Sequence, residues 1–288
     1  MKPHYIKDNK SLRIPQNIIF YDTETYEKKV FNKHFHYLRL GVLRCVRLSG
    51  TKIVSDKYYI FKTAEEFWNV VERYARKKTR LWLVSHNQHF DFNVVNGFRE
   101  LITRGWQLKR LVIESDIFAV KFTKDERTIL VVDSTNYFKA PLKDLGEQIN
   151  LPKLTVDFER ATDEELITYC KRDVEILSEY FLRFLRYWVE NDLGTFGVSI
   201  ASLAFNAFKH RFLKHKILVH DNREAIELEL DSYRGGRNEC FRIGEVREKI
   251  YKLDVNSMYP FVMRFNPFPV KLKRVLKDLT PEALRLLL

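Results

Sequence analysis

The sequence is short of cysteine, glycine and proline, with 3, 10 and 8 of each among 288 residues. The cysteines are far apart and odd in number, which excludes a disulfide framework and a zinc ribbon. No run of about 18 apolar residues occurs, so no membrane-spanning helix is predicted. The opening residues, MKPHYIKDNK, have no apolar core, which excludes a secretory signal peptide. These absences predict a soluble protein of a reducing compartment that is not secreted and has no membrane partner.

Acidic residues are in deficit, with 38 Asp and Glu against 50 Lys and Arg and a formal net charge of +12. Such a charge is typical of proteins that bind a polyanion such as nucleic acid. The alternative is that the basic charge serves only solubility. Hydrophobic residues make up 45% of the chain, which is enough for one large domain or two modest ones.

Residues 1–190 have the pattern of an α/β domain, in which strands come first and then alternate with helices. The first strand is predicted from residue 17 to Asp22. Further strands are predicted over residues 37–48, 52–61 and 80–85, and two or three more within residues 107–132. Helices are predicted over 63–75, 91–104 and 162–190, the first and last of them with a capping box. A helical connector follows over 191–223, and strands are predicted over 225–241 and 250–263.

The stretch NIIFYDTET, residues 17–25, carries two carboxylates at the end of the first predicted strand. Side chains alternate along a strand, so Asp22 and Glu24 project from the same face. Two like charges side by side repel each other unless a cation lies between them. Either a lysine or a metal ion would satisfy this pair.

Two further acidic residues stand in a similar context. Asp91 lies where a predicted strand gives way to a helix, and Asp173 lies within the long helix, four residues after Tyr169. A spacing of four places Tyr169 and Asp173 on one helix face. Together the four carboxylates would form an oxygen-rich site for two Mg²⁺ or Mn²⁺ ions, suited to phosphodiester hydrolysis. The alternative is four unrelated solvated acids.

The joint pattern resembles a known family. D-T-E-T at Asp22 and Glu24, H-N-x-x-F-D ending at Asp91, and Y-x-x-x-D ending at Asp173 resemble the three motifs of DnaQ-like 3′–5′ exonucleases. They most resemble the proofreading domain of family B DNA polymerases. The resemblance implies an RNase H-like fold, with these four acids as metal ligands.

The resemblance also assigns roles to other residues. Tyr169 would position the attacking water, and Lys153, in KLTVDF, matches a catalytic lysine of the protein-primed subfamily; a surface lysine is the alternative. The positions that match contacts to the single-stranded 3′ end are Thr25, Asn87, Phe90, Ser134 and Thr135. The close histidine pairs His34/His36 and His86/His89 lack a zinc motif, so loop histidines beside a nucleic-acid cleft are favoured.

A second pair of motifs lies downstream. Tyr233, Arg234, Gly235 and Gly236 resemble the Tyr-x-Gly-Gly motif of the same polymerases, and LDVNSMYP resembles their motif A. Asp254 would then be a metal ligand of the nucleotidyl-transfer site. Ser257 and Tyr259 would line the nucleotide pocket, where Tyr259 would select deoxynucleotides. The alternatives are a hairpin turn and a buried strand ending at a proline.

The sequence is therefore interpreted as the N-terminal part of a protein-primed type family B DNA polymerase. Its parts would be an exonuclease domain (1–190), a helical connector with the Tyr-x-Gly-Gly motif (191–250) and the start of a palm (251–288). The motifs K-x-x-x-N-S-x-Y-G and D-T-D do not occur in the chain, so we expect no polymerisation by this chain alone.

The expected partners are DNA, as single-stranded 3′ ends and primer–template, and deoxynucleoside triphosphates. A second polypeptide with the rest of the palm and thumb, and a terminal priming protein, are the further candidates. The expected location is the cytoplasm or an organellar or viral replication site. Two alternatives stay open: a free-standing 3′–5′ exonuclease or exoribonuclease, and a non-catalytic nucleic-acid-binding subunit.

Overall fold

The computed structural model describes residues 2–31, 33–114, 117–233, 235, 239–240, 242–277 and 279–285. Internal contacts divide the chain into two compact units, Asp8–Phe212 and Met1–Lys7 with Leu213–Leu288. Arg234 and Gly236 of the glycine motif lie outside the described residues. In the part of the chain that the structure describes, no helix is long and apolar enough to cross a membrane.

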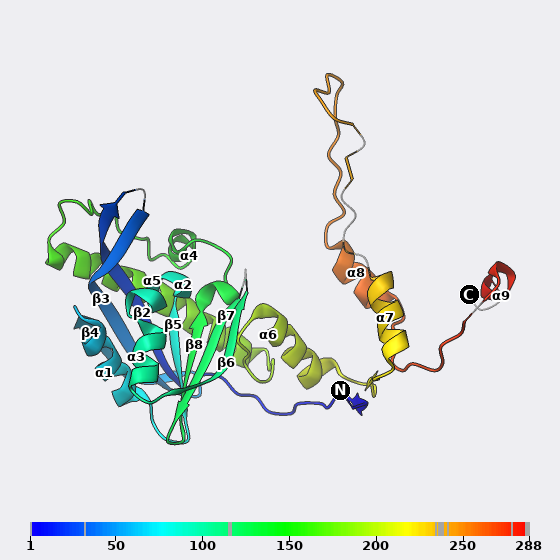
Figure 1. The fold of residues 1–288 in the computed structure, drawn as a ribbon, viewed down its shortest axis with the longest axis horizontal. Coiled ribbons are helices and arrows are strands. Elements are labelled where there is room, and N and C mark those ends of the chain that lie inside the picture. The colour runs from blue at the N-terminus through cyan, green and yellow to red at the C-terminus, as the bar shows by residue number, and fades with distance from the viewer. Residues whose placement is uncertain are drawn as a thin grey trace. The chain divides into compact units, whose positions relative to one another are not determined.

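The larger unit is built on a seven-stranded sheet with the order β4-β3-β2-β5-β8-β7-β6 (Figure 1). Strands β2 (Asn17–Val30), β3 (Lys33–Ser49) and β4 (Lys52–Phe61) are antiparallel neighbours. Strand β5 (Arg80–Ser85) runs parallel to β2, and β8 (Arg127–Asp133) runs parallel to β5. Strands β6 (Gln107–Glu114) and β7 (Ile117–Lys124) extend the sheet in antiparallel fashion. The predicted α/β class is confirmed.

Helices cover both faces of this sheet, with α5 on one face and α1, α2 and α3 on the other (Figure 1). The α-helices of this unit are α1 (Ala64–Tyr74), α2 (Gln88–Val94), α3 (Gly97–Thr103), α4 (Leu142–Gln148), α5 (Asp163–Glu190) and α6 (Ile200–Ala207). Short turns of 3₁₀-helix (Ser134–Asn136) and π-helix (Phe208–Phe212) complete the unit. Both predicted capping boxes are present, at Thr63 and Thr162.

The alternation of side chains along β2 decides which way the first two carboxylates face. Ile18 and Phe20 lie in the core beneath α5, whereas Ile19 and Tyr21 lie in the core on the opposite face. Asp22 and Glu24 continue the period of two and therefore face the α5 side. The same core includes Phe196 and Leu203, so the compact unit runs past residue 190, to Phe212.

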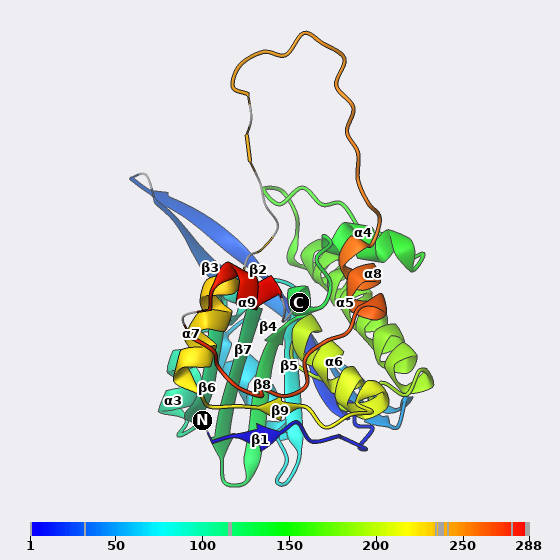
Figure 2. The same cartoon turned by 90° about the vertical axis from the view of Figure 1, so that its right-hand side faces the viewer.

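Three of the elements predicted for the larger unit differ in the structure. The helix predicted over 91–104 is split into α2 and α3, because Asn96 takes a left-handed conformation with φ 52°. The first strand does not end near Asp22 but continues to Val30, and β3 begins at Lys33 rather than residue 37. Pairing between β2 and β3 therefore continues beyond the other strands, as a hairpin that projects from the sheet (Figures 1 and 2).

The smaller unit contains the downstream motifs. Its elements are β1 (His4–Tyr5), paired with β9 (Leu218–Val219), and helices α7 (Arg223–Ser232), α8 (Met258–Phe265) and α9 (Pro281–Arg285). The strands predicted over 225–241 and 250–263 are therefore wrong. In α7, the Asn222 side chain accepts a hydrogen bond from Ala225 N at 3.1 Å, and this N-cap begins a helix rich in Glu and Leu. In α8, Pro260 lies in the first turn, where proline is tolerated.

Candidate active site and metal centre

The candidate site lies at the carboxyl ends of the parallel strands. Pairing of β2 with β5 stops at Phe20, and Asp22 follows just beyond it. Asp91 lies in α2, the helix that follows β5, and Asp133 is the last residue of β8. The topology therefore collects acidic residues that are far apart in sequence at one edge of the sheet.

Asp91 is hydrogen-bonded to Thr23, the residue between Asp22 and Glu24 in the sequence. Thr23 Oγ1 donates a hydrogen bond of 2.6 Å to Asp91 Oδ1, and both side chains are buried. Burial raises the pKa of Asp91 to about 7, although the hydrogen bond from Thr23 opposes this. Without a cation nearby, Asp91 is thus only partly ionised at neutral pH.

Asp22 and Glu24 form the centre of the acidic group. Burial, and then the charges of Asp91 and Asp173, raise the pKa of Asp22 well above its ordinary value. Burial, and then the charges of Asp22 and Asp173, raise the pKa of Glu24 to about 8. The charge of Asp91 thus acts on Asp22, and the charge of Asp173 acts on both Asp22 and Glu24.

Helix α5 brings the third predicted motif to the same place. Lys153 Nζ donates a hydrogen bond of 2.6 Å to Asp173 Oδ2, and the same nitrogen lies 4.9 Å from the centre of the Tyr169 ring. Burial lowers the pKa of Lys153, but the Asp173 carboxylate more than offsets it, so the net shift is upward. Lys153 is thus a half-buried cation that is paired with Asp173.

The residues present fit divalent cations. Ligand atoms of Asp22, Glu24 and Cys170 lie within 4.8 Å of one another. Burial raises the pKa of the Cys170 thiol, which stays protonated and donates to the Asp22 carbonyl oxygen at 3.4 Å. Asp173 Oδ1 is buried without a hydrogen-bond partner among the described residues. The donors left for an ion are carboxylate oxygens, which Mg²⁺ and Mn²⁺ prefer.

The predicted contacts to a single strand lie around this group. Asn87 is exposed in a left-handed conformation with φ 96°, and Phe90 packs edge-on against His36 with ring centres 5.2 Å apart. Thr25 Oγ1 lies 3.2 Å from Nδ1 of the same histidine. Thr25 and Phe90 are thus brought together on the two sides of His36.

Ser134 and Thr135 lie deeper than the other predicted contacts. The Ser134 hydroxyl is buried and lies 2.8 Å from His86 Nδ1, whereas Thr135 is half-buried beside it. The histidines have separate partners, since His89 packs against Phe118. Among the described residues no group of three potential ligands includes a histidine.

The sequence analysis missed Asp133, which organises the turn before α2. Asp133 is buried and accepts hydrogen bonds from the backbone nitrogens of Gln88 (2.7 Å), Thr135 (2.8 Å) and Asn87 (3.2 Å). Gln88 is itself fixed by the Tyr21 hydroxyl, which donates to its side-chain oxygen at 2.6 Å. The run of apolar residues that ends at Asp133 repeats the pattern that singled out Asp22, so the signal was present.

We expect Asp133→Ala to lower the free energy of unfolding by about 2–3 kcal/mol, because buried backbone donors lose a charged acceptor. Tryptophan fluorescence during urea unfolding measures this, since all 4 tryptophans belong to the larger unit. The control is Asp125→Asn in the exposed turn between β7 and β8, where φ is 46° and asparagine is tolerated, so the change should be below about 0.5 kcal/mol. Equal losses in the two variants would contradict the role of Asp133.

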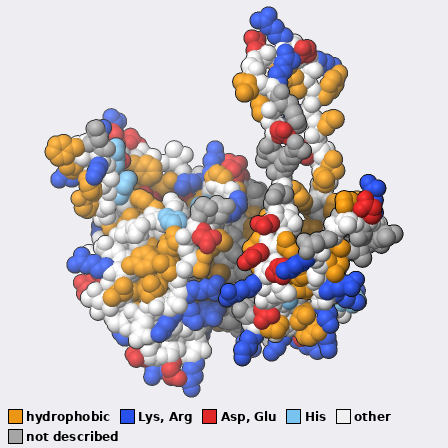
Figure 3. All heavy atoms as spheres, turned by 45° about the vertical axis from the view of Figure 1, so that its right-hand side comes forward, with side chains coloured by type: hydrophobic (Ala, Val, Ile, Leu, Met, Phe, Trp, Pro, Cys, Tyr) orange, Lys and Arg blue, Asp and Glu red, His pale blue; other side chains and the backbone are white. Residues whose placement is uncertain are grey.

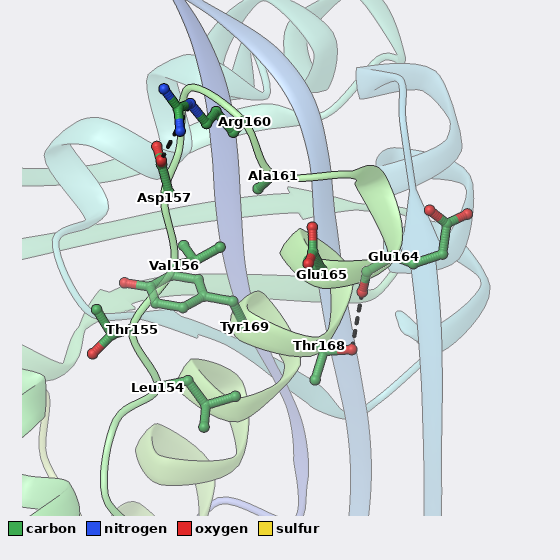
Figure 4. A pocket seen from close by; sticks show the side chains of 10 residues that line it. All are labelled: Leu154, Thr155, Val156, Asp157, Arg160, Ala161, Glu164, Glu165, Thr168 and Tyr169. Atoms are coloured by element: carbon green, nitrogen blue, oxygen red, sulfur yellow. Dashed lines mark hydrogen bonds and ion pairs between the residues drawn. The ribbon is translucent and has the colours of Figure 1, made fainter.

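A pocket of about 540 Å³ opens beside Tyr169 (Figure 4). In Figure 4 the Tyr169 ring lies next to Val156 and Thr155, on the chain segment that leads to α5. The charged residues that line the pocket are Asp157, Arg160, Glu164 and Glu165. Its excess of acids makes it unsuited to hold a phosphate.

The downstream motif residues lie in the smaller unit and are exposed to solvent. The side chains of Tyr233 and Tyr259 are 75% and 67% exposed, and Asp254 and Ser257 are exposed as well. A Cβ on Gly235 would meet no atom of the described residues within 4 Å.

Comparisons with known proteins bear on the second half of the chain. Residues 153–280 match the family described as DNA polymerase type B, organellar and viral. A probable DNA polymerase from Neurospora intermedia is 30% identical over 124 residues. This alignment covers 42% of the chain and only 13% of that protein, so the chain spans a small part of its relative's length. Residues 153–280 are thus similar to type B DNA polymerases of the organellar and viral kind, which agrees with the resemblance drawn from the downstream motifs.

Proposed function

We propose that the chain is part of a DNA polymerase whose larger unit is an RNase H-like, metal-dependent exonuclease acting on the 3′ ends of single-stranded DNA. The order of β4, β3, β2, β5 and β8, three antiparallel strands beside two parallel ones, supports the RNase H-like fold. The observations that support the activity are the close pair Asp22 and Glu24, the influence of Asp91 and Asp173 on its pKa values, and the unpartnered Asp173 oxygen.

Each residue of the site has a defined task in this proposal. Asp22, Glu24, Asp91 and Asp173 would hold two divalent ions, which stabilise the attacking and leaving oxygens of a phosphodiester when bound. The Tyr169 hydroxyl would orient the attacking water. Lys153, fixed by its ion pair with Asp173, would place a positive charge beside the scissile phosphate. Asn87, Phe90 and Thr25 would hold the terminal nucleotides, with Ser134 and Thr135 beneath them.

We expect Tyr169→Phe to slow single-turnover cleavage of a single-stranded oligonucleotide by about 100-fold, because a misplaced nucleophile loses the benefit of orientation. Its affinity for the strand should stay within about twofold, since the ring is kept. Rapid-quench cleavage and fluorescence anisotropy measure the two quantities. Tyr187→Phe, an exposed tyrosine on the same helix, is the matched control. A loss of affinity with an unchanged cleavage rate would assign Tyr169 to stacking instead.

We propose for the smaller unit a part in nucleotide selection by a polymerase palm. The family match extends to residue 280 and so includes Asp254, Ser257 and Tyr259, which favours a polymerase over a free-standing exonuclease. Asp254 would bind a metal ion, and Ser257 and Tyr259 would face the deoxynucleoside triphosphate. The motif Tyr233–Gly236 would contact the primer–template. In this proposal residues 1–190, 191–250 and 251–288 serve as exonuclease, connector and palm.

The proposed role of the smaller unit is tested by measuring how a fluorescent deoxynucleotide binds the full chain in the presence of primer–template and Mn²⁺. We expect binding that falls about tenfold or more in Asp254→Ala, because the ion that bridges protein and triphosphate is lost. Equal binding by Asp254→Ala and the parent would contradict the assignment of Asp254.

A further inference from the structure

The hairpin that projects from the sheet has no task in the functions described above. We call residues 26–31 and 33–37 the arm; it contains the distal ends of β2 and β3, and all of its residues are exposed. We propose that one face of the arm binds single-stranded nucleic acid and guides it into the carboxylate site. This inference rests on the proposed exonuclease function for its purpose, but the binding itself is measured separately.

The register of the hairpin defines the two faces of the arm. Residues paired across two antiparallel strands point to the same side of the sheet. One face, the aromatic face, consists of the pairs Tyr26–Tyr37, Lys28–Phe35 and Val30–Lys33. The opposite face carries the pairs Glu27–His36 and Lys29–His34.

The aromatic face is continuous with the catalytic carboxylates. Along β2, Tyr26 and Lys28 follow Asp22 and Glu24 at the period of two, so all four project from one side of the strand. The irregularity in pairing after Glu24 skips Arg39 on β3 and leaves the alternation of β2 intact. A strand lying along this face would therefore run directly to the metal site.

Arg39 confirms this orientation independently. Its guanidinium lies 5.0 Å from the centre of the Tyr26 ring. The same group donates to Asp163 at 3.1 Å and to the Ala161 carbonyl oxygen at 2.8 Å, at the start of α5. Tyr26 is thus on the side of the sheet where α5 supplies Tyr169 and Asp173.

The chemistry of the aromatic face suits a single strand. Tyr26, Tyr37 and Phe35 are 55%, 55% and 42% exposed, and the same face carries one lysine on each strand, Lys28 and Lys33. Exposed rings that stack on bases, interleaved with cations that neutralise phosphates, are the usual elements of single-strand binding. Figure 3 shows hydrophobic, basic and histidine side chains gathered on this projection, at the upper left of the view.

The other occupants of such a face fit less well. A second protein surface would meet lysines on each strand, and such charges disfavour both an apolar interface and edge-to-edge pairing. The pocket beside Tyr169 offers no alternative route, because Asp157, Glu164 and Glu165 line it and repel phosphate. A polyanion with exposed bases is the ligand that meets both the rings and the lysines.

The test compares two double variants of the full chain. Lys28→Ala/Phe35→Ala removes one lysine and one ring from the aromatic face, whereas Lys29→Ala/His34→Ala removes the same from the opposite face, one residue away. Affinity is measured by anisotropy with labelled oligothymidylates of about 20 and about four nucleotides, in EDTA so that nothing is cleaved. Identical thermal melting, followed by tryptophan fluorescence, confirms that both variants fold. Lys28→Glu against Lys29→Glu is a second, single-site comparison.

We expect the aromatic-face variant to lose about tenfold or more in affinity for the long strand, and the opposite-face variant less than about twofold. Binding of the short strand should hardly change, because it reaches the carboxylate site without the arm. Equal losses in the two variants, or no loss in either, would overturn the proposal. If the face-specific loss is found but the parent cleaves no DNA with Mn²⁺, the arm is upheld as a binding surface and the exonuclease proposal fails.

Discussion

We expect Asp22→Ala/Asp91→Ala to digest a 5′-labelled single-stranded oligonucleotide at least about 1,000-fold more slowly than the parent with Mg²⁺ or Mn²⁺. The two carboxylates come from different elements, β2 and α2, so their loss removes ligands from two sides of the metal centre. The fold should survive, because neither residue belongs to either hydrophobic core.

The control for this variant is Asp125→Ala/Asp144→Ala, which removes two carboxylates outside the acidic group. Gel analysis of the oligonucleotide ladder gives the rate, and thermal melting checks the fold. The parent should also degrade single-stranded DNA faster than duplex DNA, since the proposed site receives an unpaired 3′ end. A double variant that is as fast as the parent would remove these residues from the active site.

We expect the stability of the metal-free protein to fall as pH rises from about 4.5 to about 8, and divalent ions to reverse this. Glu24 has a pKa of about 8 in the folded state against 4.5 for the isolated side chain. In this window the folded protein keeps a proton that the unfolded chain has released. Unfolding therefore loses a proton, and the free energy of unfolding decreases with increasing pH. Asp91, with a pKa of about 7, acts in the same direction.

Metal ions bind the ionised carboxylates, so their effect on stability should grow with pH. Saturating Mn²⁺ should raise the melting temperature by roughly 5 °C or more at pH 8.5 and by about 1 °C at pH 5.5. Asp22→Asn/Glu24→Gln should melt higher than the parent in EDTA, because the repulsion is removed, and should respond little to Mn²⁺. A stabilisation by Mn²⁺ that is the same in this variant and in the parent would place the ion elsewhere.

Much of the candidate site could be predicted because local patterns in the sequence mark its residues. Asp22 follows an apolar run, Asp91 follows another, and Asp173 shares a helix face with Tyr169; each is a local feature of spacing. The capping boxes at Thr63 and Thr162 are local in the same way. In the smaller unit local patterns misled, since the alternation in IELEL is typical of a strand, yet Asn222 begins a helix there.

Other parts depend on contacts between residues far apart in the chain. That Asp133 supports the turn before Asp91 follows from the parallel pairing of β5 and β8, which no spacing within either strand reveals. The pKa values of Glu24 and Asp91 are set by burial and by neighbours from other elements. The length of the arm was missed because its exposed strands lack a buried face, and a buried face is what produces the alternation used to predict strands.

The sequence by itself determined which side chains carry the chemistry and which of them share a face, because residue type and the periods of strand and helix are local properties. Only the tertiary structure decided that the face of Asp22 and Glu24 is also the face of α5, so that Lys153 meets Asp173 there. It also decided that this face continues along the arm. These two arrangements depend on strand pairing and on packing between segments that are far apart in the sequence. Their free energy comes from contacts that no short stretch of the chain contains.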